Sequence, residues 1–244
     1  MRPLRFRWAE RALEAVLEQI PHLEKEMLTL ETLVAPGDVC FDVGAAGGIY
    51  MYLLARRTGP GGQVHAFEPR PRPYRAIGRA RRLLGMDTVS VHRVGLADEK
   101  GSMEIRIPSW HGVQFTTRAF LASAHGRDAE QVPDGFTGLH SLTIPMTTID
   151  HFVVDRTVRR IDFIKADVEG AELALLEGAR TSIERWHPTI LLEIEERHLG
   201  RYGKHPVEVV EFLTRYGYRM HVFADGVLSP VGEVTPSENN YLFF

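Results

Sequence analysis

A glycine-rich loop and an acidic residue after it carry the first chemical signal in the sequence. The segment 41–50 reads Phe-Asp-Val-Gly-Ala-Ala-Gly-Gly-Ile-Tyr, and an apolar run gives way there to a helical pattern. Glycine at such a junction lets the backbone turn sharply and lets a ligand approach without a Cβ in the way. Glu68 ends the next apolar run, at about the separation expected between such a loop and a ribose-binding acid. Its carboxylate can accept hydrogen bonds from both ribose hydroxyls.

The spacing of the glycines argues against a dinucleotide site. A dinucleotide fingerprint starting at Gly44 needs glycine at positions 46 and 49, where the chain has Ala46 and Ile49. The loop instead reads acidic-x-Gly-x-x-x-Gly, from Asp42 through Gly44 to Gly48. S-adenosylmethionine has no phosphate, so its loop must leave room for the methionine part and offer a carboxylate to the ammonium group. The loop therefore favours S-adenosylmethionine as the cofactor.

A second group of acids follows two later apolar runs. Asp167 ends the run 161–166, beside the expected methyl position, and is the first candidate for a general base or a substrate orienter. Glu169 is the next candidate, although it could simply support the start of a helix. Glu193 and His198 follow the next run and complete the catalytic candidates. Asp167, Glu193 and His198 could together hold a divalent cation such as magnesium, but no tight ligand spacing appears, so no metal is predicted.

The segment 109–140 is long for a loop in a compact domain, and such loops are often lids over a site. Trp110, His111 and Phe115 are the candidates for contact with the substrate, and the alternative is a poorly ordered insertion. His111, His125 and His140 are further candidates for the base.

The helical segment after Glu68 is crowded with arginines. Arg72, Arg75, Arg79 and Arg82 recur at spacings of three and four, which places them on one helix face. A phosphate-rich acceptor or RNA could use such a stripe. A solvated helix face is the simpler interpretation, so nucleic acid is not the expected partner.

Strands and helices alternate along most of the chain, which predicts an α/β fold. Short apolar runs at 39–43, 63–67, 89–96, 161–166 and 189–194 predict parallel strands, and 218–223 and 241–244 predict two closing strands. The expected architecture is a mostly parallel seven-stranded sheet with helices on both faces. We expect residues 1–36 to form a helical lead-in and 37–244 one methyltransferase-sized domain, with strands at 103–107 and 142–146 flanking the lid-like insertion at about 109–140.

The composition is that of an ordinary soluble protein. The 244 residues carry a net charge of −3, 44% are hydrophobic and 25% are charged. One cysteine excludes an internal disulfide, and neither a signal peptide nor a membrane span is expected. These features predict a cytoplasmic protein with no membrane partner.

The segment 161–173, Ile-Asp-Phe-Ile-Lys-Ala-Asp-Val-Glu-Gly-Ala-Glu-Leu, closely resembles the signature of the FkbM methyltransferases. Segments 42–50, 67–74, 148–150 and 188–193 resemble further motifs of that family. The chain departs from the family pattern at two places. Ala46 stands where the family usually has Asn, and the arginine-rich helix lacks the Asn that the family usually has near its end. The resemblance implies a Rossmann-like class I methyltransferase fold. It also implies a cofactor site formed by Asp42, Gly44, Ala45, Gly48, Tyr50, Glu68, Pro69, Leu96 and Asp167.

Relatives of this kind are known chiefly as O-methyltransferases of sugars and natural products, so the implied partner is a small molecule with a hydroxyl group. A nucleic-acid or protein methyltransferase is the first alternative, but the Asn-Pro-Pro-Tyr type of motif is missing after the fourth strand. A module that binds the cofactor without transferring the methyl group is the second. The acceptor and the oligomeric state stay open, and a homo-oligomer remains one alternative.

Overall fold

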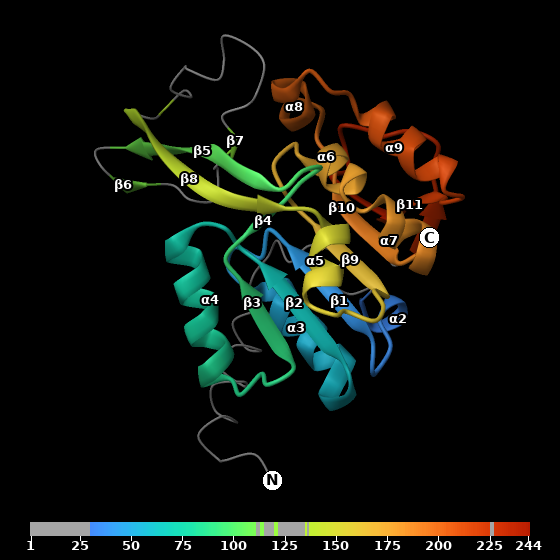
Figure 1. Ribbon diagram of the computed structural model, residues 1–244. Coiled ribbons are helices and arrows are strands. Elements are labelled where there is room, and N and C mark those ends of the chain that lie inside the picture. The colour runs from blue at the N-terminus through green and yellow to red at the C-terminus, as the bar shows by residue number, and fades with distance from the viewer. Residues whose placement is uncertain (1–29, 111–112, 115–119, 122–134, 136, 225–226) are drawn as a thin grey trace.

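The computed structural model describes residues 30–110, 113–114, 120–121, 135, 137–224 and 227–244. Its main sheet has the order β12-β11-β13-β10-β9-β1-β2-β3 (Figure 1). The parallel strands are β1 (Val39–Val43), β2 (Gln63–Phe67), β3 (Val89–His92), β9 (Phe163–Ala166) and β10 (Thr189–Glu193). Their carboxyl ends meet at one edge, where open α/β sheets bind ligands.

The C-terminal part of the sheet has one strand more than the sequence predicted. β13 (Asn240–Phe243) is antiparallel to both β10 and β11 (Met220–Ala224). β12 (Val227–Pro230) then pairs antiparallel with β11 and makes eight strands in place of the expected seven. The added strand is short, with two exposed and two half-buried residues, so it lacks the buried apolar run that signals a strand.

Helices cover both faces of the sheet, as predicted. Alternation along β1 puts Phe41 and Val43 in one core and Cys40 in the other. The Phe41 face is covered by α5 (Ile149–Asp155), α6 (Glu172–Glu177), α7 (Arg180–Trp186) and α9 (Pro206–Arg215). The Cys40 face is covered by α2 (Leu30–Leu33), α3 (Ile49–Thr58) and α4 (Pro71–Leu83). The short α8 (Glu196–Leu199) follows β10 at the carboxyl edge, and α2 is the described part of the predicted lead-in.

A second sheet projects beyond the carboxyl edge (Figure 1). Its long antiparallel pair, β5 (Gly101–Trp110) and β8 (Gly138–Thr147), runs from the Gly101–Met146 pair to the Ser109–Gly138 pair. β4 (Gly95–Leu96) pairs with β8, while β6 (Val113–Gln114) and β7 (Phe120–Leu121) pair with β5. The two predicted strands therefore extend into both ends of the segment 109–140. The predicted run 89–96 is divided between the two sheets.

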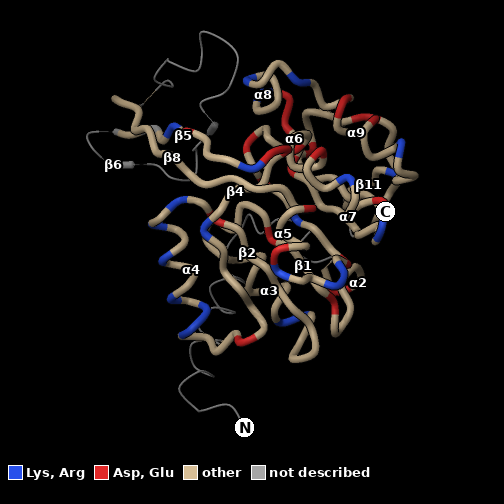
Figure 2. Tube along the Cα trace, in the orientation of Figure 1, with Lys and Arg blue, Asp and Glu red and all other residues tan. Residues whose placement is uncertain are grey.

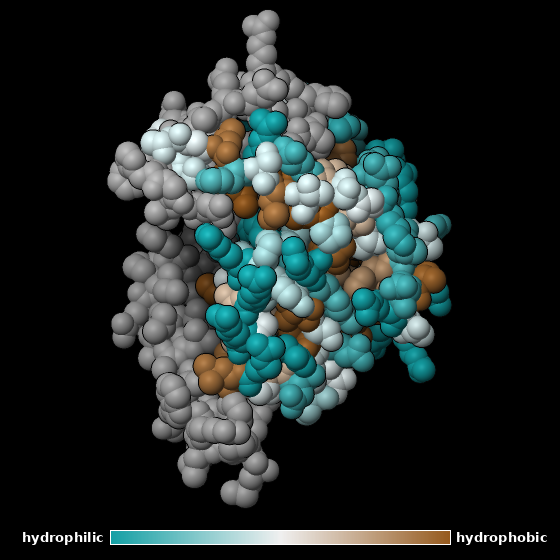
Figure 3. All heavy atoms as spheres, turned by 60° about the vertical axis from the view of Figure 1, so that its left-hand side comes forward, coloured by the Kyte–Doolittle hydropathy of each residue, from teal (hydrophilic) through white to brown (hydrophobic). Residues whose placement is uncertain are grey.

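The arginine stripe on α4 has the predicted placement. Arg72, Arg75, Arg79 and Arg82 are all exposed, and Ile77 is the helix's one buried residue. Figure 2 shows the basic segments along α4, and hydrophilic side chains cover much of the described surface on that side of the molecule (Figure 3). Among the described segments, no helix combines the length and apolar character needed to cross a bilayer.

Candidate active site

The glycine loop is held between the ends of β2 and β9. Gly44 and Gly48 have φ angles of 78° and 80°, in the left-handed region that favours glycine. The backbone N–H groups of Gly44 and Ala45 both donate to the carbonyl of Phe67, at 3.1 and 3.0 Å. On the other side, a Cβ at Gly44 would lie 1.9 Å from the carbonyl oxygen of Asp167. Glycine is thus required at position 44 for both the turn and the close packing.

A cavity of about 230 Å³ opens beside this loop at the carboxyl edge. Five of the predicted cofactor residues line it: Gly44, Glu68, Pro69, Leu96 and Asp167. The predicted catalytic residue Glu169 lines it as well. The second sheet supplies an apolar wall that sequence reasoning did not assign to the site, formed by Ile105, Ile144 and Met146. Their alternation in two predicted strands was the available signal, but only the pairing of those strands shows which face meets the cavity.

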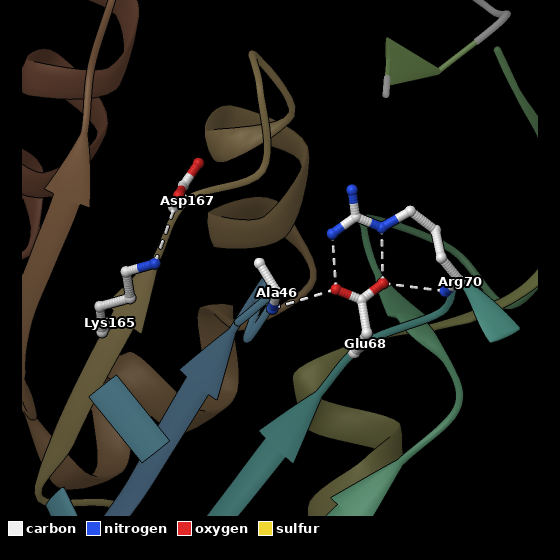
Figure 4. Close-up of polar contacts among 5 residues, drawn as sticks. All are labelled: Ala46, Glu68, Arg70, Lys165 and Asp167. Atoms are coloured by element: carbon white, nitrogen blue, oxygen red, sulfur yellow. Dashed lines mark hydrogen bonds and ion pairs between the residues drawn. The ribbon is translucent and has the colours of Figure 1, made fainter. Parts of the chain in front are cut away.

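Glu68 is fully buried, and its carboxylate is surrounded by donors (Figure 4). Oε1 accepts from the backbone N–H of Arg70 at 2.9 Å and from Arg70 Nε at 2.7 Å. Oε2 accepts from the backbone N–H of Ala46 at 3.0 Å and from Arg70 Nη2 at 2.6 Å. The two side chains form a bidentate ion pair in the wall of the cavity. Arg70 is therefore a site residue that the sequence analysis did not single out.

Asp42 lies in β1 and does not line the cavity. Its side chain is fully buried. Burial raises the pKa of Asp42 to about 6, with the charge of Asp167 adding to the shift and that of Lys165 opposing it. Lys165 is the residue paired with Asp42 on the neighbouring strand β9, and its Nζ lies 4.9 Å from the ring centre of Tyr50.

Three other predicted cofactor residues also lie outside the cavity wall. Ala45 and Tyr50 are buried in the core on the α3 face. Gly48 precedes α3, and a Cβ there would lie 3.0 Å from the Ile77 side chain. These residues shape the loop and pack it against α4.

Asp167 and Glu193 form a pair of carboxyl groups at the ends of adjacent strands. Burial raises the pKa of Glu193 to about 9, and both the charge of Asp167 and the hydrogen bond to it add to the shift. Burial opposes ionisation of Asp167 as well, but the Lys165 ammonium at 3.5 Å and the hydrogen bond from Glu193 hold its pKa below the usual value. At neutral pH the pair therefore carries one proton, which Glu193 donates to Asp167.

Glu169 and His198 are brought together on the same side of the site. Glu169 Oε2 lies 3.2 Å from His198 Nε2 and 3.8 Å from Arg201 Nη1. Glu169 has a φ of 54°, a strained conformation for a residue with a side chain, and such strain is concentrated at functional sites. Burial raises the pKa of Glu169 to about 7, and the nearby charge of Asp167 adds to this effect.

The acids near His198 differ from the predicted set of metal candidates. Glu193, Glu195 and His198 have ligand atoms within 4.8 Å of one another, and Asp167 is not in this group. Glu195 already forms an ion pair with Arg197 and accepts from Asn239 at 3.1 Å. Within the described residues, the proximity of these three side chains is the one feature that points to a metal site.

The predicted substrate residues fall at the margin of the described chain. Trp110 ends β5, but its side chain lies outside the described part, as do His111, Phe115 and His125. His140 is exposed on β8 and does not line the cavity next to Glu68. Glu172 is buried and accepts from the backbone N–H of Gly170 at 3.0 Å, so it supports the start of α6.

Comparison with known proteins identifies the family. Residues 42–220 match the family described as the methyltransferase FkbM domain. The chain belongs to the FkbM methyltransferase family. It is 29% identical over 202 residues to 31-O-demethyl-FK506 methyltransferase FkbM of Streptomyces tacrolimicus, covering 75% of this chain and 73% of that protein. Methyltransferase 1 of Beauveria bassiana is 27% identical, covering 59% of this chain and 61% of that protein.

A solved structure agrees with the class I methyltransferase fold of this FkbM family member. The methyltransferase FkbM of Methylobacillus flagellatus KT superposes with a TM-score of 0.53 at 17% identity. The match covers 91% of this chain but 51% of that one, so the present chain spans about half the length of the solved protein. The likeness supports the fold.

The cavity of this FkbM methyltransferase suits a positively charged, partly apolar ligand. Its ionisable wall residues are three acids, Glu68, Asp167 and Glu169, and one cation, Arg70, which is already paired. The rest of the lining is largely apolar and includes Leu96, Ile105, Ile144 and Met146. A pyrophosphate would meet repulsion from the acids, whereas a sulfonium and an ammonium group would be attracted. The residues present therefore fit S-adenosylmethionine.

Proposed function

We propose that this methyltransferase transfers a methyl group from S-adenosylmethionine to a hydroxyl oxygen of a small-molecule acceptor. The observation that carries the proposal is the joining of acidic and apolar walls in one cavity beside the glycine loop. The cofactor supplies an activated methyl group on its sulfonium. The protein must bind the cofactor, orient the hydroxyl and receive its proton.

Glu68, Leu96 and Asp167 are the proposed cofactor ligands. Glu68 is buried at the end of β2, where its carboxylate can accept from ribose hydroxyls. Leu96 and the apolar wall of the second sheet suit the flat face of the adenine base. Asp167 keeps its charge because Lys165 and Glu193 stabilise it, so it can attract the ammonium or sulfonium group.

Asp42 has an indirect role in this proposal. It lies behind the loop and faces Lys165 on the next strand. Its charge therefore acts on the loop and on Lys165. Gly44, and not Asp42, lines the cavity at this point. Direct contact between Asp42 and the cofactor ammonium would require the loop to move.

Glu169 is the proposed general base. A base works best when its pKa is close to the working pH, and burial brings the pKa of Glu169 to about 7. Its side chain lines the cavity and is 23% exposed, so an acceptor can reach it. Burial lowers the pKa of His198 to about 4, so this histidine is uncharged at neutral pH, and its Nε2 lies 3.2 Å from Glu169 Oε2.

The hydroxyl acceptor is supported by the site and by a relative. Glu169 can take the proton that an alcohol must lose, whereas no divalent metal is needed for that step. The relative from Streptomyces tacrolimicus is named for an O-demethyl substrate. We infer that this chain methylates a hydroxyl group of a natural product or sugar, by the same kind of O-methyl transfer.

The first test is calorimetric titration of the purified chain with S-adenosylhomocysteine. Saturable binding is expected, and a chain that gives no heat would exclude the proposed cofactor. The second test is transfer of a labelled methyl group to a panel of sugars and hydroxylated macrocycles, with RNA and a protein mixture as the competing acceptors. Labelled RNA or protein with no labelled small molecule would replace the proposed acceptor class. Binding without any labelled product would instead favour a cofactor-binding module.

A further inference from the structure

The ion pair between Arg70 and Glu68 occupies the acceptor positions that a ribose needs. A carboxylate offers about four lone-pair positions to donors. At Glu68 two are taken by the backbone N–H groups of Ala46 and Arg70, and two by Nε and Nη2 of Arg70. A ribose bound through two hydroxyls requires two acceptor positions on this group. In the present arrangement none is left.

The two kinds of donor differ in their freedom to leave. The backbone N–H groups belong to the glycine loop and to the residue before α4, so they hold the carboxylate in place. The guanidinium sits at the end of a flexible side chain that is 13% exposed. Only the guanidinium can exchange with a ligand without moving the backbone.

A neighbouring hollow gives the guanidinium a place to go. Arg70 lines the cavity beside Glu68 and also a second hollow of about 300 Å³ between the start of α4 and the second sheet. Arg72 and Arg75 line that hollow, and no carboxylate of the described chain forms an ion pair with either of them. A displaced guanidinium would therefore lose its partner and meet two like charges.

We propose that Arg70 is a latch on Glu68 that the cofactor ribose must displace, so that Arg70 lowers cofactor affinity. The proposal rests on the proposed function, because it takes Glu68 as the ribose ligand. In the free protein Arg70 neutralises the buried carboxylate. When the cofactor binds, its ribose hydroxyls donate to the Glu68 carboxylate in place of Arg70 Nε and Nη2. The guanidinium then moves into the second hollow. The free-energy cost of this exchange lowers the net affinity for the cofactor.

The test compares the affinity of Arg70→Met and the unmodified chain for S-adenosylhomocysteine by calorimetry. Methionine keeps the length and apolar stem but has no donors, so the ribose meets no competitor. Affinity is expected to rise by roughly tenfold, the value of one charge-assisted interaction that no longer has to be broken. Arg70→Lys, which offers a single ammonium, is expected to fall between the two. Arg79→Met is the matched control, because Arg79 is an exposed arginine on the helix that follows Arg70, and it should leave affinity unchanged.

NMR of the Arg70 side chain in the unmodified protein tests the proposal independently of whether Arg70→Met folds. In ¹⁵N-labelled unmodified protein, the Arg70 Nε–H signal should shift toward that of a solvated arginine when S-adenosylhomocysteine is added. An unmoved signal, or unchanged or weaker affinity in a folded Arg70→Met, would overturn the latch while leaving the cofactor assignment intact. If neither the unmodified chain nor Arg70→Met binds the compound, the proposed function fails and the latch fails with it.

Discussion

The backbone of Gly44 touches the backbone of Asp167: a Cβ at position 44 would lie 1.9 Å from the Asp167 carbonyl oxygen. The contact joins the glycine loop after β1 to the end of β9. The proposed cofactor ligand Asp167 directly follows β9. The loop and the acid thus depend on each other for position.

Gly44→Ala is expected to destabilise the protein and remove binding of S-adenosylhomocysteine. A left-handed conformation costs an alanine about 1–2 kcal/mol, and the overlap with Asp167 must be relieved by a backbone shift that adds to this cost. Thermal unfolding and calorimetry measure the two effects. Gly78→Ala is the control, because this glycine lies inside α4 with nothing within 4 Å of an added Cβ. An unchanged unfolding temperature in Gly44→Ala would contradict the packing argument.

Glu68→Ala is expected to weaken binding of S-adenosylhomocysteine by roughly ten- to a hundredfold, since hydrogen bonds to a charged acceptor contribute about 1.5–3 kcal/mol. The variant also removes the cost of displacing Arg70, so the measured loss is smaller than the full contribution of the ribose hydrogen bonds. Titration calorimetry gives the affinity, and Glu99→Ala, at an exposed position, serves as the control. Normal affinity in Glu68→Ala would remove Glu68 from the cofactor site.

Methyl transfer is expected to rise with pH between about 6 and 8 and then level off. Glu169 acts as a base only when ionised, and burial raises its pKa to about 7, so protonation below this pH removes the base. Initial rates at saturating cofactor, with an acceptor from the labelled panel, give the profile.

Glu169→Gln is the variant that isolates this group. It is expected to lower turnover about a hundredfold or more, as loss of a general base does, while the affinity for S-adenosylhomocysteine changes little. Glu184→Gln, which changes an exposed acid in α7 (Arg180–Trp186), is the control. A pH profile that keeps its midpoint in Glu169→Gln would assign the base to another group, with Asp167→Asn as the next variant to measure.

The half-buried pair His65 and His92 is expected to make folding sensitive to acid. Their rings stack, with His65 Nδ1 3.1 Å from His92 Nε2, and burial lowers the pKa of each to about 4. The unfolded chain binds protons at these groups near pH 6.5, so stability is lost as pH falls from about 6.5 to 4.

The comparison variant replaces both histidines by phenylalanine. The difference in unfolding free energy between it and the unmodified chain should change by on the order of 2 kcal/mol across this pH window. The acids of the site titrate in both proteins, so their contribution to the unfolding free energy cancels in that difference. Urea unfolding at pH 7 and pH 4.5 measures it, and His140→Gln, at an exposed position, is the control. A difference that does not vary with pH would show that the pair takes up protons equally well in the folded state.

Local pattern in the sequence was sufficient for the fold class and for part of the site. Short apolar runs followed by helical periodicity predicted the parallel strands, because both faces of such strands are buried. The same frame placed Gly44, Glu68 and Asp167 at strand ends, and parallel strand ends share one edge. The signature at 161–173 also predicted the family that residues 42–220 match.

Tertiary structure decided which of those residues face the cavity. Asp42, Ala45, Gly48 and Tyr50 are close to Gly44 in sequence, but the direction of their side chains depends on how the loop packs against α3, α4 and β9. The apolar wall came from the pairing of β5 with β8, whose partners are far apart in the chain. The contact of Arg70 with Glu68 depends on a side-chain conformation that residue spacing does not specify. Side-chain direction and long-range pairing are set by the packing of the whole domain, and this is why the sequence could name the acids but not their partners.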